Sequence, residues 1–199
     1  MEFNSDYAQK LHRHVVIWLD EYIGLPASNE KMKDRFRRVT YPLETFTKVQ
    51  PTIDFIRQQQ AAQMSVFLIV SGQLALDIVP QVYDYNCVIQ IFIFCAKIKN
   101  YTEWATQYID KVLMFDFDED LLIRLTNEIA NYLTDEAEKY GKQDKVEFAA
   151  GLLDWAAWLY NDADTLQRAA CKKMLANIKQ RRQKLDIDYQ IVYPNQFNN

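Results

Sequence analysis

The sequence predicts an α/β protein built on a parallel sheet, because short apolar runs alternate with segments that can form helices. The runs are rich in β-branched residues and occupy residues 15–19, 66–70, 89–94 and 112–115. Runs without polar alternation are typical of strands that are covered on both faces. Strands that alternate with helices indicate βαβ units, in which parallel strands are joined by right-handed crossovers.

The first predicted strand, at residues 14–20, is followed by a loop and then by a helix that begins at Glu30. Pro42 stops this helix, because proline disfavours helical backbone at the residue before it. The Thr-rich, alternating segment at residues 43–49 predicts a second, more exposed strand. Pro51 is expected to be the first residue of the next helix.

The remaining strands and helices of the sheet domain follow the same alternation. Strand three is expected at residues 66–70, and Pro80 is expected to bend or end the helix after it. Strand four, a short helix at residues 102–108, strand five and a long helix from Asp118 complete the pattern. Five strands and five helices of this length predict a flavodoxin-like three-layer sandwich with the strand order 2-1-3-4-5.

The chain after this sandwich has a different pattern, which predicts an α-helical hairpin. Residues 146–159 are strongly apolar, residues 160–164 are read as a tight turn, and a second helix is expected at residues 165–184. A hairpin this apolar has to pack against another surface. The predicted organisation is therefore a leader (1–13), an α/β domain (14–140), the hairpin (141–185) and a tail (186–199).

Composition and charge narrow the classes of function. The net charge of −4 gives no electrostatic reason to bind nucleic acid or an acidic membrane. No apolar run reaches the roughly 18–20 residues of a membrane span, and the polar start does not resemble a signal peptide. Cys87, Cys95 and Cys171 are too widely spaced for a disulfide framework or a zinc site. We therefore expect a soluble cytoplasmic protein with reduced thiols and no metal site.

The candidate ligand-binding residues lie where the predicted strands end, because ligands of open parallel sheets bind at the carboxyl ends of the strands. They are Asp20, Glu21, Ser71, Gly72 and Asp116. Asp20 and Glu21 offer hard oxygen ligands, but two are too few for a tight Mg²⁺ site, and the alternative is a solvated strand end. Ser71 can cap the next helix, whose first N–H groups can hold an anion.

No catalytic residue is predicted from the sequence. Cys95 would need a neighbouring base. The two histidines, His12 and His14, lie at the other end of a strand about 20 Å long, so a buried structural thiol is expected. The chain has neither a GxGxxG nor a Walker pattern, and we expect no cofactor.

The strand ends resemble those of the receiver domains of two-component signalling. Asp20 and Glu21 stand in the place of that family's acidic pair, and MFDFDEDLL at residues 114–122 has the outline of its fifth strand and last helix. For residues 14–133 the resemblance implies a receiver fold.

The positions that perform phosphoryl transfer in receivers differ in this chain. Ser71 replaces the phosphoacceptor Asp, Cys95 replaces a Thr or Ser, and Phe115 stands in the region of the conserved Lys. Phosphoryl transfer to a carboxylate needs that nucleophile, a metal and a cation to offset developing charge. The resemblance therefore implies a pseudo-receiver without phospho-aspartate switching.

The arrangement also resembles receiver-like modules at the N-termini of large invertebrate multidomain proteins that carry tetratricopeptide repeats or an ADP-ribosyltransferase domain. The segments VVIWLDEYIG, FRRVTYPLETF, VFLIVSG and IFIFC carry this resemblance. Residues 148–178 are similar to one helix-turn-helix of a tetratricopeptide repeat. The resemblance implies a role in signalling or protein interaction.

The leading hypothesis is a non-enzymatic module that acts through a homodimer or a protein partner. Receivers commonly pair through the face of helix four, strand five and helix five, which would here include Trp104, Tyr108 and part of residues 123–132. Trp155 and Trp158 are a second candidate contact, because large exposed apolar patches mark binding. The alternative hypothesis is a nucleotide- or NAD-related enzyme or sensor with its site at the strand ends.

Overall fold

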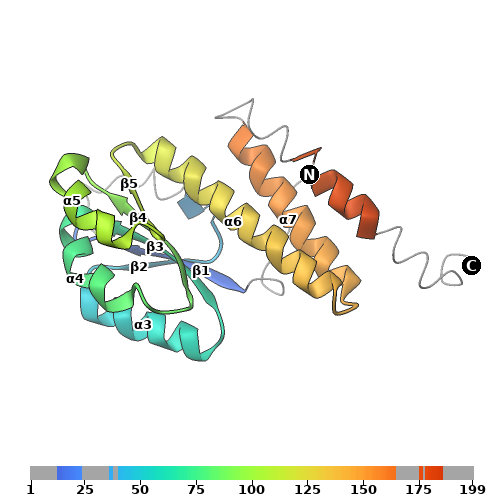
Figure 1. The fold of residues 1–199 in the computed structure, drawn as a ribbon, viewed down its shortest axis with the longest axis horizontal. Coiled ribbons are helices and arrows are strands. Elements are labelled where there is room, and N and C mark those ends of the chain that lie inside the picture. The colour runs from blue at the N-terminus through green and yellow to red at the C-terminus, as the bar shows by residue number, and fades with distance from the viewer. Residues whose placement is uncertain (1–12, 24–35, 38–39, 165–174, 177, 186–199) are drawn as a thin grey trace, which may run out of the picture. The chain divides into compact units, whose positions relative to one another are not determined.

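A computed structural model of the chain describes residues 13–23, 36–37, 40–164, 175–176 and 178–185 (Figure 1). Within these residues five parallel strands form one sheet in the order β2-β1-β3-β4-β5, which confirms the predicted fold class and strand order. The strands are β1 (His14–Leu19), β2 (Leu43–Phe46), β3 (Ser65–Ser71), β4 (Val88–Phe94) and β5 (Val112–Phe115).

Helices alternate with the strands along the chain and continue after β5. They are α3 (Val49–Ala61), α4 (Gly72–Val82), η1 (Ile98–Asn100), α5 (Thr102–Ala105), η2 (Thr106–Tyr108), α6 (Asp118–Gly141) and α7 (Val146–Asp164). The described chain forms two compact units, and the division falls inside α6, between Leu125 and Thr126. No helix among the described residues is both long enough and apolar enough to cross a bilayer.

The central strands of the sheet are buried on both faces, which explains why they are apolar at successive positions. All six residues of β1 are buried, and so are the five central residues of β3. On one face, Ile17 and its partner Leu68 belong to the core that α3 and α4 cover (Figure 1). On the other face, the Trp18 ring lies 4.9 Å from the ring of Phe36. The parallel register keeps β1 and β3 in phase along the whole length of β1, and β3 and β4 are in phase after a register shift between Val66 and Phe67, so the central strands form an apolar layer on each face.

Two boundaries near β2 differ from the sequence prediction. The strand ends at Phe46, and α3 already begins at Val49, so Pro51 is the third helical residue and not the first. Proline is tolerated there, because the N–H groups of the first helical turn have no acceptor within the helix. The short helix expected at residues 102–108 is divided into α5 and η2.

In the helical unit that starts at Thr126, the turn between helices does not lie at residues 160–164, where the sequence predicted it. Residues 160–164 are helical within α7, and the chain instead turns between α6 and α7, where Asp144 adopts a positive φ of 58°. The Tyr160 hydroxyl donates a hydrogen bond to Asn131 Oδ1 of α6 at 2.7 Å. The rings of Tyr140 and Phe148 meet at 4.5 Å on either side of the turn. The observed hairpin is therefore formed by α6 and α7.

A further helical stretch at residues 178–185 packs with this hairpin. Arg181 pairs with Glu138 of α6 at 2.6 Å, and Arg182 lies 3.8 Å from Asp154 of α7. Ile178 is buried. Most of the second helix predicted at residues 165–184, the leader up to residue 12 and the tail at residues 186–199 lie outside the described residues.

Candidate functional site

The Asp20 carboxylate closes the turn that follows β1. Its Oδ1 accepts a hydrogen bond from the Tyr22 amide at 3.0 Å, and the Asp20 carbonyl accepts one from the Ile23 amide at 3.2 Å. The Asp20 amide donates to the Phe46 carbonyl at 3.0 Å, which ties the ends of β1 and β2 together. Asp20 is half-buried and Glu21 is exposed. Asp20 therefore has a structural role in this turn, whereas Glu21 faces solvent.

Ser71 and Gly72 lie at the start of α4, as predicted, but their roles differ from simple capping. Ser71 occupies the N-cap position with extended backbone, yet its hydroxyl makes no capping hydrogen bond. Gly72 is buried, and a Cβ placed on it would lie 2.7 Å from Cys95 Cβ and 2.8 Å from Tyr101 Cζ. The Cys95 and Tyr101 side chains therefore fill the space beside the first turn of α4.

The Cys95 thiol lies where β4 ends, next to the end of β5. Its amide donates to the Phe115 carbonyl at 2.9 Å. Burial raises the pKa of the Cys95 thiol; a hydrogen bond with the Lys97 backbone partly opposes this rise, and the negative charge of Asp116 adds to it. Since only the thiolate is a good nucleophile, a raised pKa makes Cys95 poorly reactive at neutral pH. Burial likewise raises the pKa of Cys87, while Cys171 lies outside the described residues.

The sheet order brings some of the predicted site residues together and separates others. Asp20 and Ser71 directly follow the paired residues Leu19 and Val70, so they end neighbouring strands. Asp116 follows β5, three strands away from β1, which corresponds to about 14 Å at the usual strand spacing. Within the described ranges no group of three or more His, Cys, Asp or Glu side chains is placed to hold a metal ion.

His14 lies at the start of β1, at the end of the strand away from Asp20. His14 is buried in β1, and its ring meets the Phe67 ring edge-on at 5.9 Å. His12 lies outside the described residues.

The aromatic residues expected at an interface next to β5 form a row of ring contacts. Trp104 and Tyr108 lie 5.0 Å apart, and Tyr108 meets Tyr83 at 5.1 Å, so both predicted residues are half-buried against the sheet core. The most exposed apolar side chains near β5 are instead Ile109, at 73% exposure, and Phe117, at 65%. The sequence analysis missed these two because each lies in a short turn beside β5, where no periodicity marks it.

Trp155 does not present the exposed contact surface that the sequence suggested. It is only 2% exposed, and Trp158 is half-buried. The helical period explains the burial of Trp155, because Leu152, Ala156 and Leu159 lie on the same side of α7 and are also buried. A partner therefore has no access to the Trp155 ring in this structure.

A pocket that the sequence analysis did not find opens at the carboxyl end of β2. Its volume is about 390 Å³. Among the described residues, its lining combines two cationic side chains, two threonines and three apolar residues: Arg37, Lys48, Thr45, Thr47, Ile23, Phe46 and Pro51. The first turn of α3 contributes to its wall through Pro51.

Comparison of the chain with protein-family models, with curated proteins and with solved structures returned no match. The fold and the side-chain chemistry described above are therefore the basis for a functional proposal.

Proposed function

We propose that this chain is a non-enzymatic interaction module, a receiver-like domain that has lost the chemistry of phosphoryl transfer. The proposal rests on the side chains found at the ends of the strands. The end of β3 bears Ser71 in place of a carboxylate, Asp20 is held in its own turn, and the Cys95 thiol has a raised pKa. A phosphoacceptor carboxylate with a metal and a balancing cation would need different side chains there.

The surface beside β5 supports an interaction role. β5 is an edge strand of four residues, and Ile109 and Phe117 are exposed in the turns before and after it. Large apolar side chains that remain exposed next to a sheet edge favour contact with another protein surface. We propose a second copy of the chain as the partner, in line with the pairing of receivers through this part of their fold.

Light scattering across a concentration series tests the proposal. The double variant Ile109→Asp and Phe117→Asp should remain monomeric at concentrations at which the unmodified chain dimerises, because a dimer contact would bury both new charges. Leu76→Asp is the matched control, since Leu76 is 45% exposed on α4. Dimerisation that survives the double variant, or a chain that stays monomeric throughout, contradicts pairing through β5.

The alternative, a nucleotide- or NAD-related sensor or enzyme at the strand ends, is favoured by one observation. Asp20 and Ser71 end neighbouring strands at the point where the strand order reverses, which is where ligands of this sheet topology bind. Thermal-shift measurements with Mg²⁺, NAD, ADP-ribose and nucleotides separate the two functions. A rise in melting temperature that Asp20→Asn or Ser71→Val abolishes would favour the alternative.

A further inference from the structure

We propose that Tyr85 is a site of tyrosine phosphorylation and that Arg57 holds the added phosphate group. Tyr85 lies in the turn between α4 and β4, and Arg57 lies on α3. Neither residue is part of the surface assigned to pairing or of the carboxyl ends of the strands. The inference is therefore independent of both functions proposed above.

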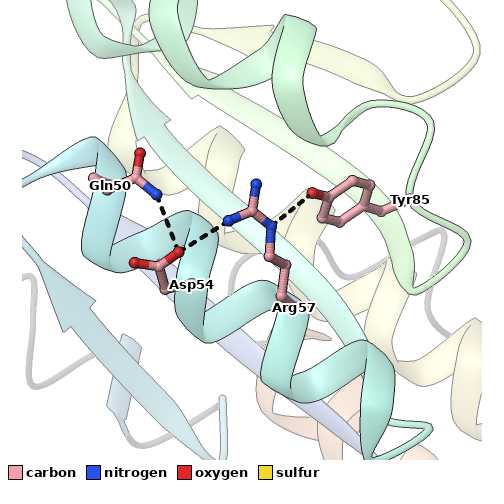
Figure 2. A network of polar contacts seen from close by, with 4 residues as sticks. All are labelled: Gln50, Asp54, Arg57 and Tyr85. Atoms are coloured by element: carbon pink, nitrogen blue, oxygen red, sulfur yellow. Dashed lines mark hydrogen bonds and ion pairs between the residues drawn. The ribbon is translucent and has the colours of Figure 1, made fainter.

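The Tyr85 hydroxyl faces a guanidinium group. Arg57 Nε donates a hydrogen bond to this hydroxyl at 3.1 Å, and the contact joins residues 28 positions apart in the chain (Figure 2). Arg57 Nη1 donates to Asp54 Oδ1 at 3.0 Å, and Gln50 Nε2 donates to the same oxygen at 3.0 Å. As Figure 2 shows, the guanidinium lies between Asp54 and Tyr85. It is therefore aimed at the hydroxyl before any phosphate is attached.

Arg57 keeps donor groups that a phosphate can use. A guanidinium has five N–H donors, and the hydrogen bonds of Arg57 to described residues use only Nε and Nη1. The side chains of Arg57 and Asp54 are 56% and 52% exposed, so solvent screens their ion pair and a phosphate dianion can compete with Asp54. Two N–H groups of one arginine can hold two oxygens of one phosphate.

Tyr83, two residues away in the same turn, has the opposite surroundings. Its hydroxyl donates a hydrogen bond to Asp110 Oδ2 at 3.5 Å. Burial raises the pKa of the Tyr83 hydroxyl, and the negative charges of Asp110 and Asp84 raise it further. The carboxylate of Asp110 would repel a phosphate on Tyr83, because like charges at this distance disfavour each other. Tyr83 is thus an internal reference for Tyr85.

The turn that carries Tyr85 is exposed on either side of this residue. Asp84 and Asn86 are exposed, and Tyr85 itself is half-buried. The Tyr85 amide donates to the Val82 carbonyl at 3.0 Å, and the Tyr85 carbonyl accepts a hydrogen bond from Lys111 Nζ at 3.1 Å. A phosphate on the ring would add a charge-assisted contact to α3, so we infer that modification fastens this turn to α3.

The phosphoryl donor in this proposal is a nucleoside triphosphate bound to a protein tyrosine kinase. The phenol oxygen of Tyr85 attacks the γ-phosphorus, the bond between this phosphorus and the β–γ bridging oxygen breaks, and the nucleoside diphosphate leaves. The phenol proton passes to a base of the kinase. The phosphate ester is mostly a dianion at neutral pH, because its second pKa is about 6.

Phosphorylation of the folded full chain tests whether Tyr85 is accessible. The enzymes used are tyrosine kinases that, with ATP and Mg²⁺, phosphorylate Tyr85 in a synthetic peptide of residues 79–91. Mass spectrometry then maps the phosphate on the full chain, which should accumulate on Tyr85 ahead of Tyr83. A full chain in which Tyr85 stays unmodified overturns the proposal, because the peptide shows that the kinases accept this sequence.

A pH titration followed by ³¹P NMR tests the role of Arg57. The second pKa of the phosphate on Tyr85 should be at least about 0.3 pH unit lower in the unmodified chain than in Arg57→Gln, because the guanidinium favours the dianion. Asp54→Asn is the matched control. It removes the competing carboxylate and keeps the guanidinium, so the pKa of the phosphate should stay as low or fall further.

Circular dichroism verifies that the variants are folded. An equal pKa of the phosphate in the unmodified chain and in Arg57→Gln overturns the assignment of Arg57 as the group that holds the phosphate. Neither negative result affects the proposed pairing through β5, which light scattering tests on the unphosphorylated chain.

Discussion

Gly72 shows how one missing side chain shapes the strand ends. A Cβ at this position would approach Cys95 Cβ and the Tyr101 ring closer than real Cβ atoms come to other atoms. Cys95 Cβ is fixed by its backbone, which is tied to Phe115, so the space cannot be opened by a rotamer change alone. The glycine thus lets Tyr101 pack directly over the first turn of α4.

Gly72→Ala is therefore expected to lower the free energy of unfolding by about 1–3 kcal/mol, the usual cost of overpacking a filled site. Urea denaturation followed by circular dichroism measures this. Gly141→Ala is the comparison, because the nearest atom there is the flexible end of Leu185 at 3.2 Å and alanine favours a helix over glycine. We expect the free energy of unfolding of Gly141→Ala to lie within about 1 kcal/mol of that of the unmodified chain. Equal effects of the two substitutions would contradict the packing role of Gly72.

At the scale of elements, Lys111 links the end of α4 to the start of β5. Its Nζ donates to the carbonyl oxygens of Tyr83 and Tyr85 at 2.8 and 3.1 Å, immediately after the last residue of α4. A cation at a helix C-terminus satisfies carbonyl groups that have no partner within the helix and interacts favourably with the helix dipole. Lys111 also lies 5.5 Å from the centre of the Tyr83 ring.

Lys111→Met should lower the free energy of unfolding by about 1–2 kcal/mol, because it keeps the length of the side chain but removes both hydrogen bonds and the charge. Thermal and urea unfolding give the value. The control variant Lys99→Met, at an exposed position in η1, should change the free energy of unfolding by less than about 0.5 kcal/mol. A loss of the same size in both variants would mean that the contacts of Lys111 contribute nothing specific.

Strands β1 and β3 could be predicted from the sequence because they are buried on both faces, which leaves a short run of successive apolar residues. The half-buried to exposed edge strand β2 was predicted instead from its Thr-rich alternation. The position at which α7 ends could not be predicted from the sequence. The string of Asn and Asp after Tyr160 has the composition of a turn. The burial of the Tyr160 ring and its hydrogen bond to Asn131, both of them tertiary contacts, instead accompany continued helix.

For the candidate site, the sequence could likewise predict some features and not others. The sequence could locate Asp20, Ser71 and Cys95 at strand ends, because strand ends follow directly from strand positions. It could not indicate that Tyr101 would cover Gly72, since the two are far apart in the chain. The pocket beside β2 was missed for the same reason, because its lining residues come from separate segments and share no motif.

At the scale of the whole molecule, the central strands of the sheet and its edge strands differ in how firmly they are held. β1, β3 and β4 each have a strand on both sides, whereas β2 and β5 are edges of four residues each. Central strands bury more apolar side chains, and their backbone hydrogen bonds open only with the larger unfolding events. The helical unit has its own contacts, among them the ion pairs of Arg181 and Arg182.

Hydrogen exchange is therefore expected to be slowest for the amides of Leu68 and Ile69 in β3, which lies between the central strands β1 and β4, and clearly faster for those of Glu44 and Thr45 in β2. Exchange measured by NMR gives the protection of each amide. Comparable protection of β2 and β3 would indicate that an additional partner covers the edge strand in solution.

The short edge strands also limit how the chain can assemble. A long, flat margin would let one molecule after another add its strand to the sheet and grow into a fibre. Four residues at each margin, with Pro42 immediately before β2, leave too little backbone for such growth. Concentrated solutions of this protein should accordingly yield closed, countable assemblies and no open-ended polymers.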